Sequence, residues 1–170
     1  PLGRLRLTPS APGLIELRVT ATDQDGYTAT QLHTLRIQDP QDTQAPLLAW
    51  QGILQSANHA SDNSLGNTSG DPLSAPITLT QLTPLQASLQ ERQLLSYALE
   101  IAPAGSTAWR PLAHATYPGT PFHQPLDLPT LDPTHLPNGV YALRLAATDL
   151  AGRTTEITAR ILIDTALKTP

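Results

Sequence analysis

Two stretches far apart in the chain share one pattern: GLIELRVTATDQDGYT at 13–28 and GVYALRLAATDLAGRT at 139–154. In both, apolar side chains occupy every second position, which is typical of a β-strand with one buried face. The expected inward positions are Ile15, Leu17, Val19 and Ala21 in the first copy and Tyr141, Leu143, Leu145 and Ala147 in the second. A second alternating run follows each stretch, so each copy predicts a β-hairpin.

The turn in each copy is built on aspartate and glycine. A type I turn favours Asp first and Gly fourth, because the carboxylate accepts backbone N–H groups and glycine tolerates positive φ. Asp23 and Gly26 hold these positions in the first copy, and Asp149 and Gly152 in the second. Asp25 adds another carboxylate to the first copy, but the second copy has alanine there. Calcium requires six to eight oxygen ligands, so the motif indicates a turn and not a calcium loop.

These hairpins suit the last two strands of an immunoglobulin-like or fibronectin type III-like β-sandwich, so the expected fold class is all-β. Further strands are expected at 4–8, 47–50, 77–82, 94–101, 108–113 and 122–128. LDPTHLPNG, which ends at Gly139, is expected to form a corner before the second copy. Tyr141 resembles the tyrosine corner of such sandwiches, in which the hydroxyl bonds back to the preceding bend.

Residues 1–39 hold too few strands to close a sandwich of about 100 residues. We therefore expect them to be the C-terminal strands of an upstream sandwich, and 47–164 to be a complete one. The remaining parts are a linker at 40–46, a mobile polar loop at 55–76 and a tail at 165–170. A half-domain leaves an apolar face open. We expect strands from outside this sequence, from another chain or from the second domain to cover it.

The composition excludes several classes of function. A net charge of −4 argues against a nucleic-acid partner, since such binding needs a basic surface. The chain has no cysteine, which excludes disulfides and thiolate chemistry. No apolar stretch approaches the roughly 18 residues of a membrane helix, so membrane insertion is not expected. The absence of any methionine suggests a piece of a longer polypeptide, with any export signal outside this segment.

The motifs of common enzymes are also absent from the sequence. The five histidines are scattered, and no H-E-x-x-H, G-x-S-x-G, P-loop or G-x-G-x-x-G motif occurs. Glu91 and Glu100 are interpreted as single carboxylates on strand or loop surfaces. The chain is therefore predicted not to be an enzyme and to need no cofactor, with calcium as the one alternative.

That alternative concerns the linker, because DPQDTQAP at 39–46 is similar to the acidic linkers of cadherins. Asp39, Asp42 and Asp149 are expected to meet at the domain junction, where they could bind calcium. Asp23 and Asp25 lie at the far end of a strand of about 30 Å and cannot join them. The alternative interpretation is that the linker aspartates are solvated and cap turns.

Two tryptophans offer a further binding hypothesis. If Trp50 and Trp109 were exposed on a sandwich, they could stack on sugar rings and form a carbohydrate-binding face. The favoured interpretation is that both fill a core in a chain with only 4% aromatic residues.

The stretches SYALEIAPAGSTAWRPLA (96–113) and LDPTHLPNGVYALRLAATDLAGRTTEITARILID (131–164) resemble the immunoglobulin-like modules of bacterial RHS/YD-repeat proteins, a group of large secreted polymorphic toxins. The resemblance implies a secreted or cell-surface bacterial protein. In it this segment serves as spacer, scaffold or docking surface, and its partners are other domains of the same polypeptide. The alternatives are an adhesin-type module, calcium-assisted or sugar-binding, whose partner is another protein or a cell-surface glycan, and an accessory domain of a secreted hydrolase.

Overall fold

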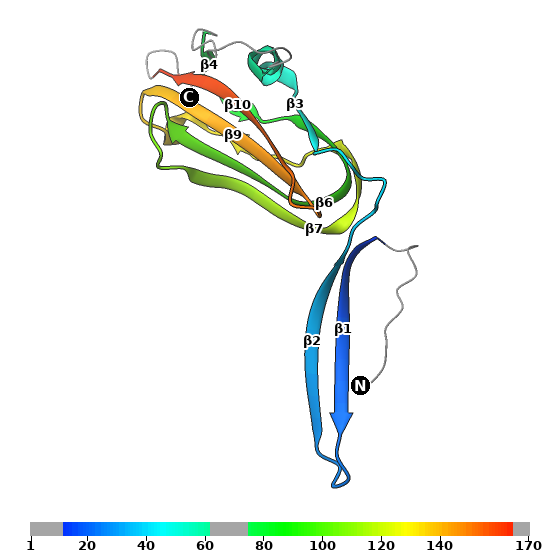
Figure 1. Cartoon of the computed structure of the whole chain (residues 1–170). Coiled ribbons are helices and arrows are strands. Elements are labelled where there is room, and N and C mark those ends of the chain that lie inside the picture. Colours follow the sequence, from blue (N-terminus) through cyan, green and yellow to red (C-terminus); the bar gives the residue numbers. More distant parts are fainter. Residues whose placement is uncertain (1–11, 62–74, 165–170) are drawn as a thin grey trace.

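The structure, a computed structural model, describes residues 12–61 and 75–164 (Figure 1). The expected strand at 4–8, most of the expected loop and the tail lie outside the described residues. The elements are β1 (Gly13–Thr22), β2 (Thr28–Ile37), β3 (Leu47–Trp50), the 3-10 helix η1 (Gly52–Ser61), β4 (Ile77–Leu79), β5 (Thr83–Pro84), β6 (Ala87–Pro103), β7 (Arg110–Pro125), β8 (Thr130–Leu131), the 3-10 helix η2 (Pro133–His135), β9 (Gly139–Asp149) and β10 (Thr154–Ile163). The fold is all-β, as the alternation predicts.

The two sequence copies form two hairpins with equivalent registers. Thr22 pairs with Thr28 at the end of β1–β2, and Thr148 pairs with Thr154 at the end of β9–β10. In both turns the glycine N–H donates to the backbone oxygen of the first aspartate, at 3.2 Å in the first copy and 3.1 Å in the second. The aspartate Oδ1 also accepts the N–H four residues on, at 2.9 and 2.8 Å. The predicted Asp–Gly turns are therefore confirmed.

The largest sheet has the strand order β3-β6-β9-β10-β4, with β7 paired along the other edge of β6. The first half of β6 pairs with β3, and its second half, from Leu94 to Pro103, pairs with β9. Irregular pairing between Glu91 and Ser96 marks the place where β6 changes partner. Bulges bend a strand and increase its twist, and the sheet curls around the core here (Figure 1). We call residues 47–164 the body.

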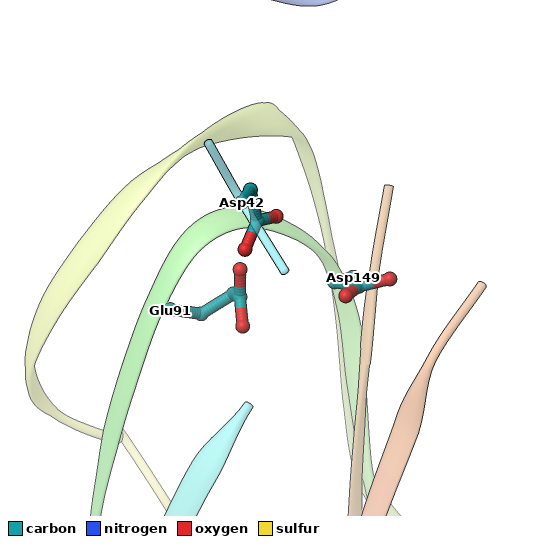
Figure 2. Close-up of side chains that lie close together, drawn as sticks. All are labelled: Asp42, Glu91 and Asp149. Carbon is teal, nitrogen blue, oxygen red and sulfur yellow. The ribbon is translucent and has the colours of Figure 1, made fainter. Parts of the chain in front are cut away.

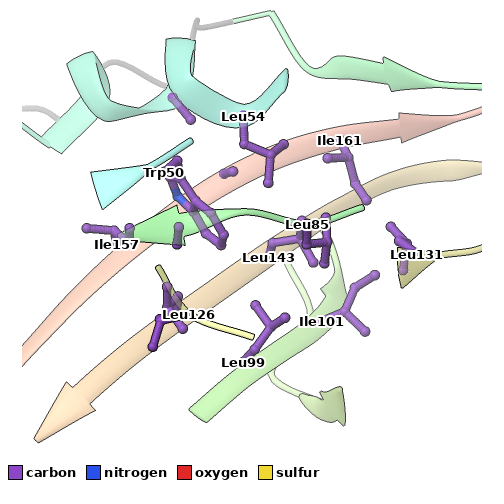
Figure 3. Packing of buried hydrophobic residues seen from close by; sticks show 14 of the residues in the cluster. Trp50, Leu54, Leu85, Leu99, Ile101, Leu126, Leu131, Leu143, Ile157 and Ile161 are labelled. Carbon is purple, nitrogen blue, oxygen red and sulfur yellow. The ribbon is translucent and has the colours of Figure 1, made fainter. Parts of the chain in front are cut away.

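The core of the body is mostly aliphatic and includes Trp50, which lies near Ile157 (Figure 3). Trp50, Leu54, Leu99 and Leu143 are fully buried. Leu54 and Ala57 are one 3-10 turn apart and are both buried, so η1 covers the core beside β3 and β10. The prediction of a polar loop beginning at 55 was therefore wrong for residues 55–61, because these apolar side chains fix the segment as a helix.

Three strand boundaries also differ from the sequence prediction. The strand expected at 77–82 ends at Leu79, and Leu82 is exposed. The strands expected at 108–113 and 122–128 are one strand, β7, because β6 is long enough to pair along all of it. The strand expected at 94–101 is longer, since β6 runs from Ala87 to Pro103. Tyr97, Leu99 and Ile101 are buried, and the bulge at Leu94 buries that side chain and leaves Leu95 half-buried.

The corner before β9 has the expected geometry. The Tyr141 hydroxyl donates to the backbone oxygen of Pro137 at 3.0 Å, and Gly139 has φ of 147°. Asp132 caps η2 by accepting the N–H of Thr134 at 2.8 Å. These contacts fix where β9 enters the sheet.

The β1–β2 hairpin extends away from the body and contacts it at its root (Figure 1). Gly13 lies so close to β7 that a side chain on it would meet the backbone oxygen of Pro118 at 2.8 Å. Its φ of 133° is also one that side chains disfavour. Towards the tip both faces become exposed, and Val19 and Leu32 are 42% and 52% exposed. The prediction of Val19 and Ala21 as inward positions was therefore wrong for the described residues, because no described element packs on that end of the hairpin.

Candidate functional site: the linker junction

The junction between the linker and the body is built on the bend of β6. Because the strand pairing is irregular near Gln93, its backbone N–H and C=O groups do not take part in the regular ladder and bond to other groups. The Gln93 N–H donates to Oε1 of Glu91 at 2.9 Å. Its backbone oxygen accepts the N–H of Leu150, in the β9–β10 turn, at 2.8 Å. The bend is thus stabilised by one side chain of its own strand and by the backbone of the second hairpin's turn.

The side chain of Gln93 holds the linker. Its Oε1 accepts the N–H of Asp39 at 2.6 Å, and its Nε2 donates to the backbone oxygen of Ile37 at 3.0 Å. Gln93 is 2% exposed, so both bonds lie away from water. Arg92 adds a bond from Nη1 to the backbone oxygen of Gln41 at 3.1 Å. A buried amide satisfied on both sides sets the exit direction of the chain after β2.

Three carboxylates meet beside this clamp. Ligand oxygens of Asp42, Glu91 and Asp149 all lie within 4.8 Å of one another (Figure 2). They come from the linker, from β6 and from the end of β9. The Asp42 side chain is 3% exposed, Glu91 is 5% exposed and Asp149 is fully buried. The junction therefore concentrates three acidic groups where water is largely excluded.

Arg153 supplies the positive charge of this cluster. Its Nε donates to Asp149 Oδ2 at 2.5 Å, and its Nη2 lies 3.0 Å from Asp42 Oδ2. The hydrogen bond to Asp149 raises the pKa of Arg153. Asp149 also accepts the Arg153 N–H through Oδ1, so one aspartate both closes the turn and orients the guanidinium. The arginine thus connects the second hairpin to the linker.

One arginine does not balance three carboxylates, and Glu91 shows the effect. Burial raises the pKa of Glu91, and the charges of Asp42 and Asp149 raise it further. The backbone N–H groups of Gln93 and Arg92 act in the opposite direction. The cluster can relieve its excess negative charge by protonating Glu91 or by taking up a cation, although Arg153 already lies against two of the three carboxylates.

The sequence predicted part of this arrangement. Asp42 and Asp149 meet at the junction as expected, but Asp39 does not join them. Asp39 caps the linker turn instead, accepting the N–H of Gln41 at 2.9 Å, and lies 3.8 Å from Arg92. The third place is taken by Glu91, so the prediction of Glu91 as a surface carboxylate was wrong. Glu91 continues the inward face of β6, on which Ala87 and Leu89 are buried at alternate positions.

Gln93 and Arg153 were not identified from the sequence. Gln93 is a polar residue directly before the strand expected at 94–101 and carries no motif, so nothing local marks it as buried. Arg153 had a weak signal, because it directly follows the Asp149–Gly152 turn and is the residue whose N–H closes it. Asp23 and Asp25 lie at the exposed tip of the first hairpin, away from this cluster (Figure 1).

The two tryptophans differ in position. Trp50 is fully buried in the core, which confirms the favoured interpretation and removes it from the sugar-stacking hypothesis. Trp109 is half-buried directly before β7, and the Arg144 guanidinium covers its ring at 4.2 Å from the centroid. Arg144 in turn donates to Glu100 at 2.6 Å. This face of Trp109 is therefore occupied by the protein's own cation.

Comparison with known proteins did not identify the chain, since neither a protein-family model nor a curated protein matches it. Within the described residues, no helix has the length and apolar character needed to cross a membrane. In the same part of the chain, Asp42, Glu91 and Asp149 form the one group of three metal-ligating side chains found close together.

Proposed function

We propose that this chain is a non-catalytic spacer module of a large exported bacterial protein of the RHS/YD-repeat type. In this proposal the body is an immunoglobulin-like or fibronectin type III-like sandwich, and the segment before it belongs to a neighbouring module. The module sets the distance and direction between neighbouring parts of the polypeptide. It is secreted or displayed at the cell surface with them.

The observation that carries the proposal is the clamp on the linker. Gln93 binds the backbone on both sides of residue 38, and Arg153 binds Asp42. A flexible linker would expose these groups to water, and a buried amide without partners would cost stability. Because buried polar side chains of the body fix the direction of the preceding segment, the chain is suited to holding two parts of a polypeptide in a defined orientation.

Rotational diffusion measured by NMR tests this role. A rigid spacer predicts that β2 and β9 tumble with a common correlation time. In a double variant, Gln93→Ala with Arg153→Ala, the hairpin should tumble faster than the body. Independent tumbling of the hairpin in the unsubstituted protein would refute the proposal. The reading frame around the segment tests the family, because YD repeats are expected downstream.

The adhesin-type alternative has one observation in its favour, the cluster of Asp42, Glu91 and Asp149. If calcium binds there, adding it should raise the Tm, and Glu91→Gln should abolish the rise. Glu100→Gln is a control, because Glu100 lies on the outer side of β6 beside Arg144. An unchanged Tm with millimolar calcium would leave the spacer role and remove the calcium-assisted one.

A further inference from the structure

Among the residues that the structure describes, nothing covers one face of the first hairpin, whereas the equivalent face of the second hairpin is buried in the body. An offset of 126 residues relates β1–β2 to β9–β10, and it holds for the pairing of the whole ladder. Val19 corresponds to Leu145 and Leu17 to Leu143, and both leucines are fully buried. Val19 is 42% exposed. The same positions are therefore core in one copy and open in the other.

The edges of the two hairpins differ in the same way. In the body, β6 pairs antiparallel with the outer edge of β9, and β4 pairs parallel with the outer edge of β10. Within the described residues, β1 and β2 pair with each other alone. A flat, unpaired strand edge invites pairing with another strand. The second hairpin therefore indicates which partners the first one lacks among the described residues: an antiparallel strand beside β1 and a parallel strand beside β2.

We propose that β1 and β2 are the closing strands of a preceding sandwich unit of the same polypeptide, an inference that rests on the proposed spacer function. An antiparallel strand of that unit, equivalent to β6, pairs with the free edge of β1. Its apolar side chains cover the face of Ile15, Leu17 and Val19. The occupant is thus a unit of the same class as residues 47–164, built from the chain before β1.

The opposite face of the hairpin faces solvent in this arrangement. Leu32 corresponds to Thr158, which is exposed in the body. The two hairpins differ in the strand β2, where the polar residues Gln31 and His33 stand at the positions of the buried Ile157 and Ala159. The apolar contact is therefore centred on β1 and on the root half of β2, where Leu35 is half-buried already.

Two exposed hydrophobic residues on opposite faces provide a matched pair of variants. In the polypeptide that includes the sequence preceding this segment, Val19→Glu should lower the Tm of the preceding unit by roughly 10 °C, because it buries a charge. Leu32→Glu should change it by less than about 2 °C. In the 170-residue chain neither variant should change the Tm of the body.

Hydrogen exchange supplies the second measurement. The β1 amides should exchange at least about 100-fold more slowly in the longer polypeptide than in the 170-residue chain. Equal exchange, or a reading frame without strand patterns before the segment, would overturn the proposal. Protection in the 170-residue chain that rises with concentration would overturn it in favour of a second copy. A rigid hairpin with unchanged β1 exchange would leave the spacer function intact and refute this inference alone.

Discussion

Gln93→Ala is the most direct perturbation of the junction. The substitution removes the bond from the Asp39 N–H and the bond to the Ile37 backbone oxygen. The backbone bonds of residue 93 to Glu91 and Leu150 remain, so the bend of β6 should persist. The expected effect is a linker that detaches from a body that stays folded.

The magnitude follows from the two lost bonds. Each contributes about 1 kcal/mol net, so docking of the linker should weaken by about 2 kcal/mol. That free energy corresponds to roughly a 30-fold change in the docking equilibrium. Amide exchange at Asp39, the donor to Gln93, should accelerate by the same factor if exchange occurs from the detached state.

Hydrogen exchange followed by NMR gives the measurement and its internal reference. Amides of β9, which is paired on both edges, report global unfolding and should be nearly unaffected. Gln90→Ala is the matched control, because Gln90 lies on the same strand and is exposed. Unchanged exchange at Asp39, or equal acceleration at Asp39 and throughout β9, would refute the clamp.

Further predictions concern the charges, the turn and the hairpin root. Because the folded state raises the pKa of Glu91 above its usual 4.5, the stability that this group contributes is complete below pH 4.5 and is lost as pH rises through the folded pKa. The stability of Glu91→Gln relative to the unsubstituted protein should therefore increase as pH rises above 4.5, in thermal unfolding followed between pH 4 and 8; a pH-independent difference would contradict the argument. Asp23→Ala should destabilise the first hairpin by about 1 kcal/mol, measured by local hydrogen exchange. Asp149→Ala, at the equivalent but buried turn, should lower the Tm of the body. Equal effects of the two substitutions would show that burial of the second turn is irrelevant. Gly13→Ala should weaken the packing of the hairpin's root against β7 by about 1–3 kcal/mol. The expected result is faster amide exchange in β1 with the Tm of the body unchanged. Unaltered exchange in β1 would show that the close approach of Gly13 to Pro118 is no constraint.

Local patterns predicted the hairpins well. Alternation and the Asp–x–x–Gly turn are local patterns, so both hairpins could be identified, and the inward face of β9 was predicted correctly. In β1 the expected inward positions Val19 and Ala21 are exposed. The Tyr141 corner was predictable for the same reason, since the hydroxyl bonds four residues back. Strand partners and strand lengths in the middle of the chain depend on distant pairing, and there β7 was split in two.

The candidate site was only half predictable. Asp149 could be assigned to the junction because the turn of the last hairpin lies at the end where the chain enters. Glu91 and Gln93 could not, because they precede the strand expected at 94–101, whereas in the structure β6 starts at Ala87 and both continue its buried alternation. The bonds of Gln93 also join residues 54 and 56 positions apart, beyond any local pattern.

The Gln93 clamp contacts the main chain of the linker and not its side chains. An N–H and a carbonyl group are offered by almost any residue at 39 and 37, with proline at 39 as the exception. Asp42, which contacts Arg153, is then the position where the linker's own side chain is specified. The clamp is therefore compatible with many sequences at 37 and 39, provided that an acidic residue stands at the position of Asp42.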